Sequence, residues 1–210
     1  MSFISEYSAF ECISKICLDE SPDLLLIGGP TGSGKSTLSL RISNELQISR
    51  LSLDNYFKDE GEMEIVLPQL NLRQWDAPDC YHWDLLIENL QDIFRKKIAK
   101  IPVFSHENSR QNGWVDFTIQ KTPLIIEGLY ALSPEILGIA ESMRLKVLSV
   151  FLDIPEEVRW QRKYNRDVLE RNENPSTLRI WFDHIIKPAE KKWINQQSTM
   201  ADLIVTHDFK

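Results

Sequence analysis

The sequence predicts a three-layer α/β fold in which helices cover both faces of a parallel sheet of about five strands. Two observations predict this fold. Short apolar runs alternate with helical patterns along the 210 residues, which is typical of parallel strands joined by crossover helices. No internal repeat interrupts the alternation, and the length suits one domain of ordinary size.

Five short apolar runs predict the strands of this sheet. The first, residues 24–27, is apolar throughout and ends in glycines, as expected of a strand buried on both faces. Helical patterns follow over residues 35–46 and, further along, over residues 83–98. The predicted strands are residues 24–27, 48–53, 124–126, 147–152 and 203–205.

An amphipathic pattern precedes the first strand. Apolar side chains recur at spacings of three and four over residues 3–18, which predicts a helix, and Ser21-Pro22 ends it. We therefore expect residues 1–20 to form an N-terminal helix packed on a main domain of residues 21–210. The same apolar face could also pack on a second subunit, so the sequence leaves open whether the chain forms a homo-oligomer. Packing on the chain's own core is favoured.

Three segments add to the predicted core. Residues 57–82 are irregular and rich in charged and aromatic side chains, which predicts a functional loop. Residues 102–104 and 114–120 flank a polar turn and predict a β-hairpin insertion at about 101–120. Residues 156–171 and 176–196 predict two long polar helices.

Composition excludes several classes of partner. The 24 basic and 31 acidic residues give a formal net charge of −7, so we expect no nucleic-acid partner and any anion to be held by a local basic site. The longest apolar runs fall far short of the roughly 18 residues of a membrane span, so we expect no membrane partner. The three cysteines are too few for a disulfide framework, and the first residues lack the pattern of a secretory signal. These features predict a cytoplasmic protein.

A glycine-rich motif follows the first predicted strand and opens the first predicted helix. The run Gly29-Pro30-Thr31-Gly32-Ser33-Gly34-Lys35-Ser36 matches the phosphate-binding loop (P-loop). Its glycines let backbone N–H groups surround a phosphate, Lys35 supplies a positive charge, and Ser36 offers a hydroxyl to Mg²⁺. A chance match is the alternative, and the strand–loop–helix context favours nucleotide binding. The candidate nucleotide contacts are Gly29, Thr31, Gly32, Ser33, Gly34, Lys35, Ser36 and Thr37.

Two acidic residues stand at the ends of predicted strands. Asp54 ends the second strand, where a carboxylate can accept the proton of an attacking hydroxyl. It can equally cap the helix that follows, and the sequence leaves both roles open. Glu127 ends the third strand, where burial is costly unless the carboxylate is paired, so a role near Mg²⁺ is favoured over a turn residue.

Basic residues recur at helical spacing in the first long polar helix: Arg159, Arg162, Lys163 and Arg166, with Arg171 a turn further on. A solvated, salt-bridged helix is the usual meaning of such a run. The alternative is a lid that closes over a triphosphate and neutralises the transferring group. The pattern alone favours the solvated helix.

Seven segments occur in the order found in one family: GGPTGSGKST, LSLDNYF, QWDAPD, PVFSHENSR, LIIEGLYAL, RDVLER and FDHIIKPAEKKWI. Over about residues 23–207 the chain resembles the phosphoribulokinase/uridine kinase family. The resemblance implies that Asp54 is the general base and that Ser36 and Glu127 serve Mg²⁺. It implies that Arg166 and Arg171 are lid arginines, with the lid at about 156–175, and that Asp76 grips ribose hydroxyls.

The sequence also departs from the family pattern around the expected acceptor. Phe57 and Phe104 stand where uridine kinases usually carry tyrosines, and the turn from Phe104 to Arg110 is one residue shorter. Lys163 replaces a lid arginine and Asn172 a glycine. Losing two phenolic hydroxyls removes hydrogen-bonding groups that discriminate between substrates. The candidate acceptor contacts are Asp76, Phe57, Phe104, His106 and Arg110.

The resemblance therefore implies a P-loop kinase that uses ATP and Mg²⁺ to phosphorylate a hydroxyl of a small molecule. Uridine or cytidine is the leading acceptor. Pantothenate, ribosyl-nicotinamide and a sugar phosphate are the alternatives within the same class. An ATP-binding regulatory protein is the alternative from another class, and it is disfavoured because a pure binder needs no base aimed at an acceptor.

Overall fold

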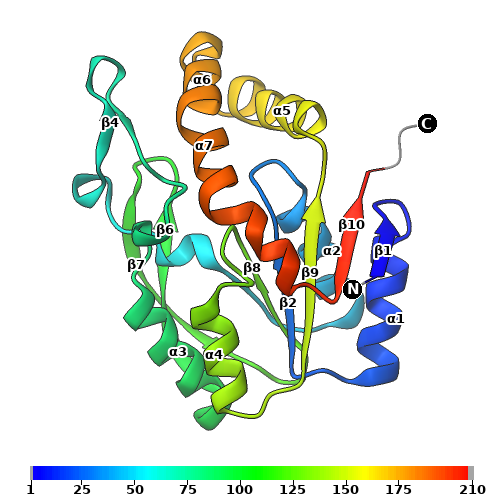
Figure 1. The fold of residues 1–210 in the computed structure, drawn as a ribbon. Helices are drawn as coiled ribbons and strands as arrows, with labels where there is room; N and C mark the ends of the chain where they lie inside the picture. The colour runs from blue at the N-terminus through cyan, green and yellow to red at the C-terminus, as the bar shows by residue number, and fades with distance from the viewer. Residues whose placement is uncertain (1, 208–210) are drawn as a thin grey trace.

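The structure, a computed structural model, describes residues 2–207. Its centre is a six-stranded sheet in the order β1-β10-β9-β2-β8-β3, and every neighbouring pair of strands is parallel (Figure 1). The predicted α/β fold is confirmed, with one strand more than expected. The strands are β1 Ser2–Ser5, β2 Leu24–Gly28, β3 Arg50–Ser52, β8 Leu124–Glu127, β9 Val147–Asp153 and β10 Leu203–Thr206.

The additional strand, β1, comes from a segment that the sequence pattern assigned to the N-terminal helix. The helix α1 spans only Ala9–Glu20, while Phe3 pairs with Ile204 at the edge of the sheet. The apolar spacing of the first residues fits a helix and a strand equally. The free edge of β10 decides between them, because it supplies backbone hydrogen-bond partners to an extended segment.

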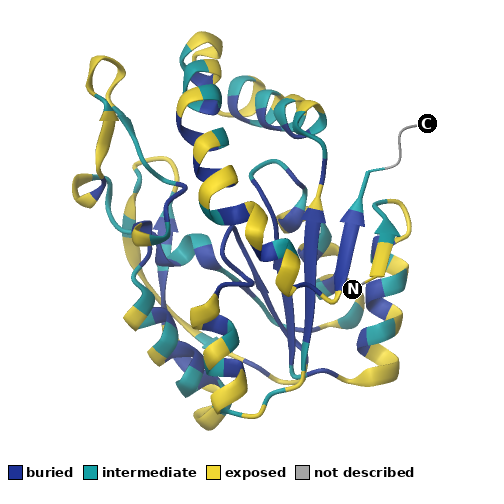
Figure 2. Ribbon diagram, in the orientation of Figure 1, coloured by how far each residue is buried: buried dark blue, intermediate teal, exposed yellow. Residues whose placement is uncertain are grey.

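Alternate residues of the central strand face two separate layers of helices. Leu25 and Ile27 of β2 pack in a cluster with Ile13 of α1 and Ile42 of α2, the helix Lys35–Leu46. Leu24 and Leu26 pack in the other cluster with residues of α3 (Trp83–Lys96) and α4 (Pro134–Ser142). This alternation follows from the two-residue period of a strand. The strands at the centre are buried along their length (Figure 2).

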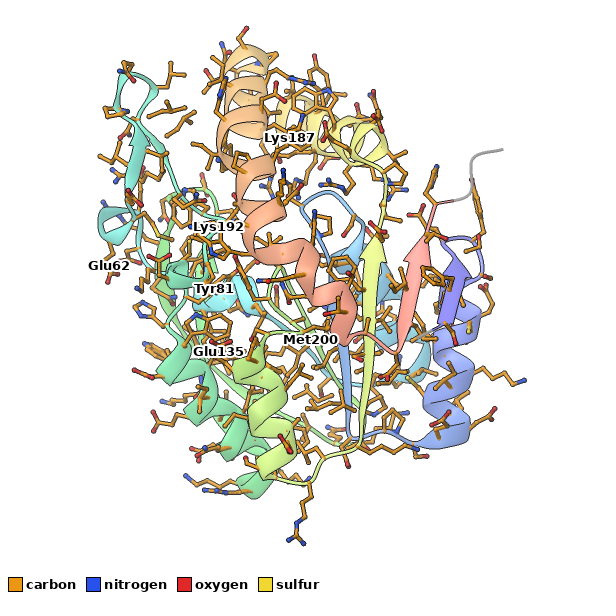
Figure 3. The ribbon with its side chains drawn as sticks, viewed as in Figure 1. Glu62, Tyr81, Glu135, Lys187, Lys192 and Met200 are labelled. Atoms are coloured by element: carbon orange, nitrogen blue, oxygen red, sulfur yellow. The ribbon has the colours of Figure 1, made fainter. Side chains whose placement is uncertain are left out.

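The first predicted polar helix lies above the carboxyl ends of the strands, whereas the second begins there and descends in front of the sheet toward the start of β10 (Figure 1). The first is α5, Glu156–Tyr164, which continues as a π-helical turn over Asn165–Glu170. The second begins as α6, Pro175–Trp181, and runs through α7, Lys187–Ala189, with π-helical turns at Phe182–Ile186 and Glu190–Ile194. A 3-10 helix over Asn195–Met200 then leads into β10. Lys187 on α7 contacts Glu156 on α5 at 2.6 Å and joins the two helices (Figure 3).

Two antiparallel hairpins lie on the side of the molecule opposite β1 (Figure 1). The predicted hairpin exists as β6, Ile98–Ser105, and β7, Arg110–Thr118. A second one, β4 Ile65–Leu67 with β5 Leu72–Arg73, occupies part of the segment expected to be irregular. Short 3-10 helices fill the rest of that segment: Leu53–Tyr56, Glu60–Glu62, Pro68–Leu70 and Pro78–Cys80. Within residues 2–207 no helix combines the length and the apolar character needed to span a bilayer.

Candidate active site

A cavity of about 860 Å³ lies where the loops that follow β2, β3 and β8 meet the hairpin β6–β7 and the helix α5. In a parallel sheet this end collects the residues that follow each strand, so it is the usual place for a ligand. Most of the residues predicted from the sequence line it. These are Thr31, Gly32, Gly34, Lys35, Ser36, Thr37, Asp54, Phe57, Asp76, Phe104, His106, Glu127, Arg166 and Arg171.

The phosphate-binding loop joins β2 to α2 in a conformation that glycine makes accessible. Gly32 has a φ of 73°, and a Cβ there would lie 2.5 Å from the carbonyl oxygen of Arg159, so both the backbone angle and the close approach of α5 require glycine. Gly29 packs on the backbone of Leu152 and does not line the cavity. Lys35 is 8% exposed, and its Nζ donates to the carbonyl of Pro30 at 2.8 Å.

Neighbouring carboxylates stabilise the positive charge of Lys35. Burial lowers the pKa of Lys35, and the carboxylates of Glu127 and Asp54 oppose that shift. Ser33, behind the loop, has a fully buried Oγ without a hydrogen-bond partner among the described residues. Ser33 does not line the cavity, whereas Lys35 does, and a buried cation on a glycine loop is a group that a polyphosphate satisfies, so the loop fits the phosphates of ATP.

Ser36 and Glu127 are brought together as the sequence predicted. The Oγ of Ser36 donates to Glu127 Oε2 at 3.1 Å, and Arg50 Nη1 contacts Glu127 Oε1 at 2.9 Å. Burial raises the pKa of Glu127, with Asp54 adding to the rise. The described residues contain no cluster of three or more metal-ligating side chains. Mg²⁺ in kinases needs only one or two protein oxygens beside phosphate and water, so this pair of residues fits it.

Asp54 faces the cavity from the 3-10 helix after β3. The N-cap of that helix is Ser52, and Asp54 makes no capping hydrogen bond, so the capping role left open by the sequence has no support. His106 Nε2, on the turn of the hairpin β6–β7, lies 3.6 Å from Asp54 Oδ2. Burial lowers the pKa of His106 in opposition to Asp54, which favours a neutral imidazole beside the carboxylate.

Asp76 is a buried carboxylate at the acceptor end of the cavity. Its backbone is fixed, because Tyr130 Oη donates to its carbonyl at 2.6 Å and its N–H donates to Gln74 Oε1 at 3.0 Å. No described group donates a hydrogen bond to its carboxylate, and the side chain is only 5% exposed. Burial raises the pKa of Asp76 to about 7, partly offset by Lys163. Such a group is satisfied when a ligand supplies donors.

An aromatic wall flanks Asp76. The rings of Phe57 and Phe104, both largely buried, lie 5.5 Å apart, and Trp75 meets them edge-on at 5.6 and 5.9 Å. Phe57 also stacks on Tyr81, with ring centroids 4.6 Å apart. We call Phe57, Trp75 and Phe104 the aromatic wall. The sequence showed no separate signal for Trp75 beyond its place beside Asp76. Arg110, by contrast, is exposed on β7 and does not line the cavity.

The lid helix is organised around one buried acid that sequence reasoning missed. Asp167 contacts Lys163 Nζ at 2.6 Å, Arg166 Nε at 2.6 Å and Arg171 Nη1 at 3.6 Å. Burial raises the pKa of Asp167, but the hydrogen bond from Arg166 and the charge of Lys163 outweigh it and lower the pKa overall. The prediction that this helix is fully solvated is therefore wrong, because Lys163 is buried and Arg166 and Arg171 line the cavity.

A second buried ion pair fixes the phosphate-binding loop. Arg159 contacts Glu190 through two hydrogen bonds, at 2.7 and 2.9 Å, and its Nη1 also donates to the carbonyl of Thr31 at 3.0 Å. The pair links the C-terminal helix, α5 and the loop. Glu190 lies in the segment KPAEKKWI, and its pairing with Arg159 becomes visible only in the folded structure.

A phosphate-binding loop, an acid facing the adjoining cavity and an arginine-bearing lid on a six-stranded parallel sheet define a P-loop kinase. The family model for "Phosphoribulokinase / Uridine kinase family" matches residues 24–208. The chain therefore belongs to the phosphoribulokinase/uridine kinase family, and it is an ATP-dependent enzyme that phosphorylates a hydroxyl group.

Curated relatives agree with this family, and a solved structure shares the fold. The chain is 28% identical over 186 residues to a uridine kinase of Aliivibrio fischeri strain MJ11, covering 85% of this chain and 83% of the relative. It is 27% identical over 183 residues to a uridine kinase of Staphylococcus aureus strain JH9, covering 85% and 84%. A kinase assigned to a fructose transport system of Silicibacter sp. TM1040 shares the fold, with a TM-score of 0.70 at 17% identity and coverage of 95% and 99%.

Proposed function

We propose that the chain transfers the γ-phosphate of ATP to a ribose hydroxyl of a nucleoside, with uridine or cytidine as the acceptor. The observation that carries this proposal is the buried carboxylate of Asp76 without a hydrogen-bond donor, in the same cavity as the phosphate-binding loop and Asp54. Two adjacent hydroxyls supply the donors that this carboxylate lacks. The names of the uridine kinase relatives support the same acceptor class.

The proposed reaction needs three groups of the chain to act together. Asp54 accepts the proton of the attacking hydroxyl, whose oxygen bonds to the γ-phosphorus while the bond to the β–γ bridging oxygen breaks and ADP leaves. Lys35 faces the phosphates, and Arg166 and Arg171 approach the transferring group from the lid. Ser36 and Glu127 would hold Mg²⁺, which neutralises phosphate charge when bound.

The aromatic wall supports a planar ring on the acceptor. Phe57, Trp75 and Phe104 offer ring faces and edges to a base but no phenolic hydroxyl. His106, which packs on Phe104 and lies 3.6 Å from Asp54, supplies a polar side chain in that region. Pantothenate and simple sugar phosphates lack such a ring. Ribosyl-nicotinamide is a second candidate, because a cationic ring beside aromatic faces gains a cation–π attraction.

The deciding experiment measures ADP release in a coupled assay across uridine, cytidine, ribosyl-nicotinamide, pantothenate and simple sugar phosphates. Asp54→Asn is expected to lower turnover by about 10²–10⁴-fold, the usual contribution of a general base, with ATP binding intact. Lys35→Ala should abolish transfer. ATP binding without acceptor-dependent release would favour the regulatory alternative, and unchanged turnover of Asp54→Asn would refute its role as the base.

A further inference from the structure

The N-terminal segment Ser2–Glu20 lies outside the family match, which begins at residue 24, yet it lines the same cavity. Glu6, Ala9 and Phe10 are part of the cavity wall, beside Val205 of β10. The strand β1 places them there by pairing with β10, and α1 packs its buried side chains against α2. A segment outside the family match therefore forms part of the proposed nucleotide site.

The order of the strands tells which part of the nucleotide reaches this wall. The phosphate-binding loop follows the central strand β2, and Asp54 follows β3 at one edge of the sheet. β1 forms the opposite edge. With the phosphates at β2 and the γ-phosphate directed toward Asp54, the rest of the nucleotide extends toward β10 and β1, where Glu6 and Phe10 lie.

A flat surface suited to a base exists at this position. The guanidinium carbon of Arg41, on α2, lies 3.6 Å from the centroid of the Phe10 ring, and Leu38 lies one turn before Arg41. All three residues line the cavity. An aromatic ring braced by a guanidinium is a stacking platform for a planar heterocycle.

Glu6 connects this wall to the lid. Its carboxylate contacts Arg162 of α5 at 2.7 Å and His207 at 2.6 Å, and a Cβ on Gly34 would lie 3.9 Å from its Oε1. Arg162 also donates to the carbonyl of Ser33 at 3.3 Å. Glu6 thus holds a lid arginine against the phosphate-binding loop, beside the platform.

We propose that the N-terminal segment completes the nucleotide site, with Phe10 stacking on the base of the phosphate donor. This inference rests on the proposed use of ATP, and it adds a base-binding contact that the family match does not contain.

The test compares binding of ATP with binding of tripolyphosphate, which has the phosphates but no base, by calorimetry on the full chain. Phe10→Ala is expected to weaken ATP binding about 5- to 100-fold, the range for loss of a base–aromatic stack, and to leave tripolyphosphate binding unchanged. Phe10→Leu fills the space without an aromatic face and should follow Phe10→Ala. Phe10→Tyr should bind ATP as the unchanged chain does. Leu18→Ala, an exposed position on the same helix, is the matched control.

Two results would overturn the inference alone: native ATP affinity in Phe10→Ala and Phe10→Leu, or an equal loss of ATP and tripolyphosphate affinity in both. Absence of ATP binding by the unchanged chain would instead overturn the proposed function, and this inference with it. Thermal unfolding of each variant separates a folding defect from a lost contact, and Phe10→Leu, which fills the space of the ring, keeps the test informative where Phe10→Ala unfolds.

Discussion

Replacing Asp76 with Asn is expected to change the pH dependence of stability. Burial raises the pKa of Asp76 from 3.8 to about 7, so the folded chain retains a proton that the unfolded chain loses between these values. The stability associated with the protonated carboxyl is fully present below pH 3.8 and is lost as the pH rises to about 7. From pH 5 to pH 8 this loss amounts to about 3 kcal/mol, at about 1.4 kcal/mol per pKa unit.

Urea unfolding of the native chain and of Asp76→Asn at both pH values measures this difference. The neutral amide cannot ionise, so the free energy of unfolding of the variant should rise by about 3 kcal/mol relative to that of the native chain between pH 5 and pH 8. The Michaelis constant for the nucleoside should rise in the same variant, because the amide accepts with one oxygen only. Asp79→Asn, exposed three residues further on, is the control. Parallel stability profiles for native and variant would refute the reasoning, since they would mean that Asp76 is hydrated.

Three further changes test other contacts of the site. Glu127→Gln weakens the proposed Mg²⁺ site and should raise the Mg²⁺ concentration that gives the half-maximal rate about tenfold or more in the ADP assay. An unchanged Mg²⁺ concentration at half-maximal rate would exclude Glu127 from Mg²⁺ binding. Glu190→Gln leaves the buried Arg159 without a charge partner and should lower the free energy of unfolding by about 3 kcal/mol, measured in urea. The exposed Glu157→Gln should lower it by almost nothing. Equal effects of the two variants would contradict a stabilising role for the Arg159–Glu190 pair. Arg166→Ala removes a lid charge from the cavity and should lower kcat about 10²–10³-fold with little change in nucleoside binding. Arg179→Ala, on exposed α6, serves as its control, and a loss confined to the Michaelis constant would place Arg166 in binding alone.

The sheet could be predicted because each buried strand is a short apolar run between helical patterns. All five predicted runs are strands of the sheet. The edge strand β1 could not be found, because Phe3 and Ile4 fit a helical period as well as a strand and only the presence of β10 decides. The hairpin β4–β5 was missed for a related reason: its strands are two to three residues long, too short to show an alternation.

The site was predictable where a motif carries the chemistry and unpredictable where long-range contacts do. The phosphate-binding loop and the positions of Asp54 and Glu127 after strands follow from local sequence. The pairing of Arg159 with Glu190 joins residues 31 apart, and it is invisible in a helix whose charges all look solvated. Asp167, which holds Lys163 and Arg166 together, shows how the same charge pattern can mark a buried network.

The pairing of Ser2 with Leu203 has a consequence for how the enzyme becomes active. A contact between residues so far apart in the chain closes a very long loop, which makes it slow and late in folding. During synthesis on a ribosome, β1 and the part of the nucleotide site formed by Glu6 and Phe10 can form only after β10 has been made. The phosphate-binding loop is fixed by Arg159 and, through it, by Glu190, which are also made late, so both halves of the nucleotide site form only when nearly the whole chain has been made.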